Sequence, residues 1–180
     1  MSRIVMKFGG TSVGSVERIN HVADIVRSEV EAKNQVVVVL SAMAGETDRL
    51  VNLTKDLSKD FPSSEYDVVI SSGEQVSVGA LSGLLNSSGV KSQSLLGWQI
   101  PILTSSDYKS SRIEAISSKV ILKLLKENNV VIVPGFQGIT AEGRVTTLGR
   151  GGSDTSAVAI AAAIKADFCD IYTDVDGVYT

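Results

Sequence analysis

The loop at residues 149–157 contains residue types suited to anion binding and phosphate chemistry. Its sequence is Gly149-Arg150-Gly151-Gly152-Ser153-Asp154-Thr155-Ser156-Ala157, and an apolar stretch follows it. The glycines let the backbone approach a ligand closely, and Ser, Asp and Thr are typical helix N-cap residues, so unpaired amide groups should collect there. Arg150 adds a planar fork for a carboxylate or phosphate, while Asp154 adds a negative charge. The mixture indicates a reaction site, although alone it also fits an ordinary capped glycine loop.

A second candidate anion site lies near the N-terminus, in Lys7-Phe8-Gly9-Gly10-Thr11-Ser12. A lysine here ends a predicted strand and two glycines form the next turn, so backbone amides can hold phosphate oxygens that the ammonium group neutralises. The segment is not a Walker A loop, because its lysine precedes the glycines and the chain contains no Gly-Lys-Ser/Thr. The dinucleotide-binding glycine spacing is absent as well.

Further polar residues stand at the ends of predicted elements. Glu74 opens a predicted helix, where it is either a ligand contact or a solvated carboxylate favoured by the helix dipole. Ser41 and Thr173 follow apolar strands, where each is either a ligand contact or a plain strand-end hydroxyl.

Two hydrophobic periodicities alternate along the chain and predict the elements that position these residues. Strands are expected over 4–8, 35–41, 130–133 and 168–173, with shorter ones near 94–96 and 102–104 and a hairpin over 139–146. Helices are expected over 16–30, 50–57, 76–85 and 120–125 and from residue 153, while 66–71 fits either type. This order predicts a single α/β domain, an αβα sandwich with a mainly parallel central sheet. Ligands bind such sheets beyond the carboxyl ends of the strands, where the glycine clusters fall.

Composition excludes several classes of function. The 180 residues carry a net charge of −3, so no basic excess is available for nucleic acid. We expect no membrane span and no signal peptide, and therefore a cytoplasmic protein. Cys169 and His21 are each the sole residue of their type, which predicts no disulfide within the chain and no soft-metal site.

Read in order, the motifs resemble those of the aspartokinases, which belong to the amino acid kinase family. The matching segments cover the whole chain: residues 7–12, 41–45, 72–74, 97–99, 134–138, 147–157 and 173–180. Relatives that act on glutamate, acetylglutamate or UMP share the sandwich but not these motifs. The resemblance implies transfer of the γ-phosphoryl group of ATP, with Mg²⁺, to the β-carboxylate of L-aspartate. The product would be 4-phospho-L-aspartate, and the reaction would be the first step in the biosynthesis of lysine, threonine and methionine.

The resemblance also implies roles for individual residues. Lys7 matches the lysine that contacts the ATP phosphates beside the Gly9 and Gly10 amides, and Asp154 matches the aspartate that organises this lysine. The remaining nucleotide-side matches are Ser41, Thr173, Asp174 and Tyr179. On the substrate side, Glu74 matches the acid that holds the amino group, and Arg150 matches the arginine that grips a carboxylate. Thr47 and Ser153 match further substrate-contacting hydroxyls.

The chain departs from the family pattern at two places. It stops at Thr180, where family members continue with an Asp-Pro-Arg segment, the rest of the kinase domain and regulatory ACT domains. We therefore expect residues 1–180 to be a catalytic domain that is incomplete at its C-terminus. A homodimer is one open alternative for its oligomeric state. Glu46 stands where the family commonly has an uncharged residue. Two alternative functions remain: an inactive module that binds aspartate or a nucleotide, and a kinase for another small acid or UMP.

Overall fold

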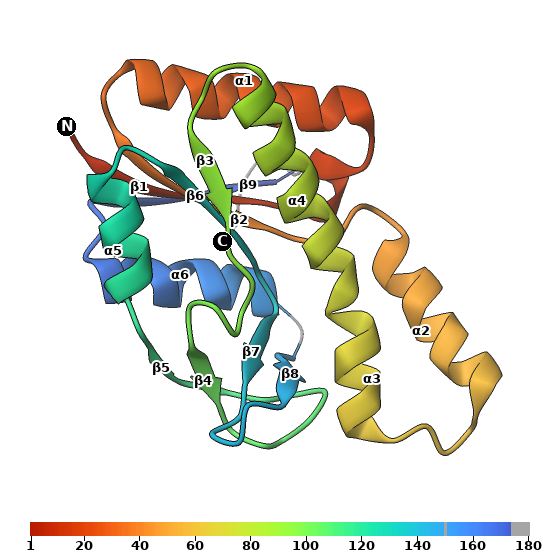
Figure 1. Cartoon of the computed structure of the whole chain (residues 1–180). Coiled ribbons are helices and arrows are strands. Elements are labelled where there is room, and N and C mark those ends of the chain that lie inside the picture. The colour runs from red at the N-terminus through yellow and green to blue at the C-terminus, as the bar shows by residue number, and fades with distance from the viewer. Residues whose placement is uncertain (150, 174–180) are drawn as a thin grey trace, which may run out of the picture.

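A parallel five-stranded sheet forms the centre of the molecule in the computed structural model, which describes residues 1–149 and 151–173. Its strands lie in the order β3-β6-β2-β1-β9. Their bounds are β1 (Arg3–Phe8), β2 (Gln35–Leu40), β3 (Ser92–Ser94), β6 (Val130–Pro134) and β9 (Phe168–Tyr172). Two helices lie on each face, α1 (Val16–Glu31) and α4 (Ser72–Ser87) on one, α5 (Lys119–Lys126) and α6 (Gly152–Ile164) on the other (Figure 1).

Alternating side chains of the strands feed two separate hydrophobic cores. On β1, Met6 and Phe8 pack with α1 and α4, whereas Val5 packs with α5 and α6. On β2, Val38 joins the first core and Val39 the second. Burial on both faces explains why these strands are continuous apolar runs. The predicted αβα sandwich with a mainly parallel central sheet is confirmed.

A second, mixed sheet of four strands was not predicted. Its order is β5-β4-β7-β8, with β4 (Ile102–Thr104), β5 (Ile113–Ile116), β7 (Gln137–Ile139) and β8 (Val145–Thr147). The hairpin expected over 139–146 is confirmed as the antiparallel pair β7 and β8, with Gly143 at a φ of 82° in its turn. Strand β5 is short and half exposed, so it lacks the apolar pattern that would predict it.

Two further helices, α2 (Glu46–Leu57) and α3 (Ser63–Ile70), flank the sandwich, and a 3₁₀ turn η1 (Gly10–Val13) follows β1. The ambiguous stretch 66–71 is thus largely helical. Helix α3 runs into α4, and the segment Ser63–Ser87 is long and apolar enough to cross a membrane. By length and composition, this segment therefore departs from the expectation that the chain has no candidate membrane span. Half of the segment's most apolar window is buried inside the fold, as in the core helix of a globular domain.

Candidate active site

A pocket of about 580 Å³ opens at the carboxyl ends of the central strands. The turns after β1, β2, β6 and β9 and the start of α6 contribute its walls, as the parallel topology predicts. Nine of the residues singled out from the sequence line this pocket: Lys7, Gly9, Gly10, Ser41, Thr47, Glu74, Ser153, Asp154 and Thr173. Arg150, Asp174 and Tyr179 lie outside the described residues.

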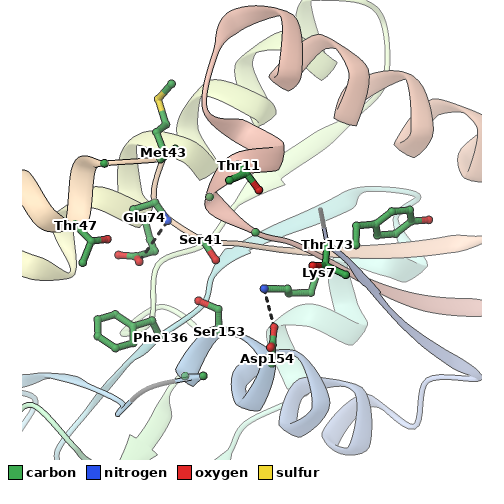
Figure 2. A pocket seen from close by; sticks show the side chains of 18 of the residues that line it. Lys7, Thr11, Ser41, Met43, Thr47, Glu74, Phe136, Ser153, Asp154 and Thr173 are labelled. Atoms are coloured by element: carbon green, nitrogen blue, oxygen red, sulfur yellow. Dashed lines mark hydrogen bonds and ion pairs between the residues drawn. The ribbon is translucent and has the colours of Figure 1, made fainter. Parts of the chain in front are cut away.

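Lys7 and Asp154 form an ion pair at one end of the pocket, with 2.6 Å between Nζ and Oδ1 (Figure 2). The lysine stands at the end of β1 and is largely buried, whereas the aspartate stands in the first turn of α6 and is half exposed. The contact holds the ammonium group at the pocket wall. A cation fixed in this way is suited to an incoming anion.

The turn after β1 needs a glycine because it touches the turn after β2. A Cβ atom at Gly10 would lie 2.8 Å from the carbonyl oxygen of Ala42. Because Gly10 has no side chain, the backbone of η1 can lie directly against the 41–45 turn at the pocket.

Glu74 is buried, with only 3% of its surface exposed, although it stands in the first turn of α4. Its Oε1 accepts a long hydrogen bond of 3.4 Å from the Ala42 amide, and Oε2 has no hydrogen-bond partner among the described residues. Burial raises the pKa of Glu74 to about 7, partly offset by hydrogen bonds from backbone amides. The alternative of a solvated carboxylate is therefore wrong. An underpartnered buried acid that faces a pocket is suited to a cationic ligand group.

Helix α6 begins differently from the side-chain-capped helix predicted from the sequence. Its N-cap residue is Gly151, at a φ of 73°, and no side chain caps it. The Ser153, Asp154 and Thr155 cluster lies within the first turn instead, and the Thr155 hydroxyl donates back to the Gly151 carbonyl (3.2 Å). The uncapped helix start keeps a partial positive charge at the pocket.

The start of α6 lies against the end of β6 because Gly135 has no side chain. A Cβ atom at Gly135 would lie 2.8 Å from both Cβ and Oγ of Ser153. Gly135 belongs to the motif 134–138, but no local pattern predicts this contact, because it joins segments distant in the chain.

The pocket has two chemically distinct ends (Figure 2). Glu74 and Thr47 lie toward one end and the Lys7–Asp154 pair with Thr173 toward the other, while Ser41 and Ser153 lie between them. An acid-lined end and a lysine-lined end suit a ligand with a cationic group and a second ligand with an anionic group.

Thr11, Met43, Phe136 and Tyr172 are among the pocket residues that have no role assigned from the sequence. Phe136 has a φ of 66°, a conformation rare for a bulky side chain, and its amide donates to the Ser156 hydroxyl at 3.0 Å. Tyr172 stacks on Phe8 with ring centroids 4.4 Å apart. Phe136 lies within the motif 134–138, which is the one sequence signal that could have indicated its place in the pocket. For Tyr172 no local signal distinguishes a pocket residue from a core residue.

The carboxylates of the pocket do not form a metal cage. Among the described residues no group of three or more His, Cys, Asp and Glu side chains could hold a metal ion. Mg²⁺ in phosphate sites commonly keeps several waters and binds one or two carboxylates together with substrate phosphates. The residues present therefore fit a Mg²⁺ that arrives on a nucleotide, with Asp154 as the acidic group beside the lysine.

The fold and the pocket agree with a family assignment. Residues 2–180 match the sequence model of the amino acid kinase family, so the chain belongs to that family. An aspartokinase of Geobacillus stearothermophilus is 55% identical over 180 residues, which are all of this chain and 44% of that protein. An aspartate kinase of Pseudomonas putida is 54% identical with the same coverage. The resemblance to the aspartokinases is confirmed, and the chain spans less than half the length of these relatives.

Solved structures give the same result. Aspartokinase III of E. coli, in complex with aspartate and ADP, superposes with a TM-score of 0.89 at 29% identity, over 98% of this chain and 50% of that one. Aspartate kinase from Synechocystis superposes with a TM-score of 0.81 at 48% identity, over 96% of this chain and 28% of that one.

Proposed function

We propose that this chain is the nucleotide- and substrate-binding part of an aspartate kinase that phosphorylates the β-carboxylate of L-aspartate with ATP. The observation that carries the proposal is one pocket with a buried acid at one end and a lysine–aspartate pair at the other. The high identity to aspartokinases and the aspartate and ADP complex of the E. coli relative support the same choice.

The lysine end suits the phosphates of ATP. Lys7, the Gly9 and Gly10 amides and the start of α6 would neutralise charge as the phosphoryl group passes between two anions. Asp154 would keep the lysine ammonium in place through their ion pair. Mg²⁺, bound with the nucleotide, would supply further neutralisation of the phosphates. Ser41, Thr173, Asp174 and Tyr179 complete the proposed nucleotide side.

The acid end suits an amino acid. The Glu74 carboxylate would bind the α-ammonium group, and Thr47 and Ser153 would contact the remaining polar atoms. Arg150 would bind a substrate carboxylate. Binding both ends of aspartate would direct its β-carboxylate toward the γ-phosphate for in-line attack.

The reaction needs no general base. A carboxylate with a pKa of about 4 is already ionised at neutral pH, so the nucleophile is ready when it binds. The terminal phosphorus–oxygen bond of ATP breaks as the new bond to the β-carboxylate oxygen forms, and ADP carries away the bond electrons. Positioning and charge neutralisation are therefore the whole task of the protein.

Hydroxylamine trapping tests this proposal, because hydroxylamine converts an acyl phosphate to a stable hydroxamate. The complete gene product should form hydroxamate only when ATP, Mg²⁺ and aspartate are all present. A panel with glutamate, acetylglutamate and UMP tests the alternative acceptors, read by the release of ADP because phosphorylated UMP is not an acyl phosphate and gives no hydroxamate. Stabilisation by aspartate or ATP without any phosphorylated product would instead support a binding module.

We further propose a cytoplasmic enzyme and assign residues 1–180 to its amino acid kinase domain.

A further inference from the structure

A fully buried carboxylate outside the pocket has no part in the proposed chemistry. Asp67 stands in α3 with none of its surface exposed. It accepts hydrogen bonds from the Lys109 amide at 3.1 Å to both oxygens, from the Thr147 amide at 2.8 Å and from the Thr147 hydroxyl at 2.8 Å. A buried carboxylate is costly unless such bonds satisfy it, so this arrangement calls for an explanation.

The partners of Asp67 belong to segments distant in sequence. Lys109 lies in the loop between β4 and β5, and Thr147 is the last residue of β8. Asp67 therefore joins α3 to the second sheet, beside which α3 lies (Figure 1). A second bond, from Gln137 Nε2 to the Ser71 carbonyl at 3.0 Å, joins β7 to the junction of α3 and α4.

Both joined segments lead directly into the pocket. Helix α3 continues into α4, whose first turn carries Glu74, seven residues after Asp67. Strand β8 ends at Thr147, two residues before Gly149, which lines the pocket with Ser153. The Leu148 amide between them donates to the Phe136 carbonyl at 2.8 Å, which holds this exit from β8 against another pocket residue.

We propose that Asp67 is a positioning residue that fixes the distance between Glu74 and the wall formed by Gly149 and Ser153. The inference rests on the proposed function, in which aspartate bridges these two walls. The start of α6 serves both ends of the pocket, but Lys7, Gly9 and Gly10 of the nucleotide end lie on β1 and the turn after it, and none of the hydrogen bonds of Asp67 reaches these segments. Loss of Asp67 should therefore weaken the use of aspartate much more than the use of ATP.

Steady-state kinetics of the complete gene product test the proposal. In Asp67→Ala, three donors lose their acceptor, and the two from Thr147 are buried. We expect the KM for aspartate to rise about tenfold or more while the KM for ATP changes less than about twofold. Asp67→Asn should restore a KM near that of the wild type. Its amide oxygen can accept from the Thr147 and Lys109 amides, and its NH₂ group can donate to the Thr147 hydroxyl.

A matched control removes a polar connection remote from the pocket. Asn86, near the end of α4, bonds through its side chain to the Ser92 amide (3.1 Å) and carbonyl (2.9 Å) in β3. Asn86→Ala should lower the melting temperature without changing either KM. If Asp67→Ala behaves like this control, or raises both KM values equally, Asp67 is merely structural and the proposal is wrong.

A second pair of variants covers the case in which Asp67→Ala does not fold. Thr147→Val removes only the hydroxyl donor and keeps the side-chain shape, so the KM for aspartate should rise about threefold, and Thr147→Ser should restore it. An unchanged KM in Thr147→Val would overturn the proposal. A wild-type enzyme inactive with aspartate would instead contradict the proposed function, and the acceptor found in the panel would replace aspartate in the same comparison.

Discussion

In the proposed function, the phosphate side of the site depends on Lys7. Lys7→Ala removes the one pocket lysine among the described residues and should lower kcat by about 10²–10³-fold, because a preorganised charge is worth about 3–4 kcal/mol in the transition state. Hydroxamate formation by the purified variant measures this. Lys123→Ala, on the exposed side of α5, is the control and should retain full activity.

Glu74 should make the use of aspartate dependent on pH near neutrality. Because its pKa is raised to about 7, the acid is protonated at pH 6 and cannot pair with the substrate ammonium group. The kcat/KM for aspartate should therefore fall on the acid side of a pKa of about 7. Glu74→Gln should lower kcat/KM and abolish this dependence.

Glu46 provides the control for that pH profile. It lies at the start of α2 and pairs with Arg49 at 2.7 Å, and this hydrogen bond lowers the pKa of Glu46. Glu46→Gln should therefore keep the acid limb of the wild type. A profile for Glu74→Gln that still falls near pH 7 would assign the titration to another group.

Glu74 should also make the stability of the fold depend on pH. Its ionisation favours the binding of aspartate but lowers the free energy of unfolding. A raised pKa means that its protonation contributes stability below pH 4.5, and that this contribution is lost as the pH rises through about 7. The shift corresponds to about 3 kcal/mol. We compare the free energy of unfolding of Glu74→Gln with that of the wild type at each pH. The difference, variant minus wild type, should be at least about 2 kcal/mol larger at pH 8 than at pH 5. Urea unfolding at both pH values checks this, and an equal difference at both would contradict it.

At the scale of elements, the contact of β6 with α6 decides whether the start of the helix reaches the pocket. In Gly135→Ala the new methyl group would lie 2.8 Å from Ser153 and displace α6, at a cost of about 1–3 kcal/mol in stability and a larger relative loss of activity. Gly79→Ala is the control. Gly79 lies within α4 with no atom near its Cβ position, so alanine should stabilise the protein by about 0.5–1 kcal/mol and keep activity. Equal activity in both variants would show that this contact does not matter.

The elements differ in how far the sequence predicts them. Buried parallel strands such as β2 and amphipathic helices such as α1 have strong local patterns, so they and the sandwich could be predicted. Strand β5 and the mixed sheet are short and stabilised by tertiary contacts, which leave no periodic signal. The same reason applies to the site. Motifs indicated Lys7 and Glu74, whereas the burial of Glu74 and the bonds of Asp67 depend on segments that meet only in the folded chain.

At the scale of the whole molecule, β9 is an edge strand of the central sheet with large exposed apolar side chains. Phe168 and Ile171 are about half exposed, and Val158 of α6 is exposed as well. Within residues 1–149 and 151–173, no strand pairs with the outer edge of β9, and an apolar edge of this kind is a template for association. A polypeptide of only these 180 residues should therefore self-associate with rising concentration in sedimentation velocity, and Phe168→Lys with Ile171→Lys should suppress this. Unchanged association in the double variant would place the contact elsewhere.

In the proposed function, this pocket brings ATP to the β-carboxylate of aspartate. Hydroxylamine trapping of the acyl phosphate, run side by side for the complete wild-type gene product and its Lys7→Ala variant, tests it most directly. Hydroxamate should require ATP, Mg²⁺ and aspartate together, and it should nearly disappear in the variant. Absence of hydroxamate from the folded wild type, or near-normal formation by Lys7→Ala, would contradict it.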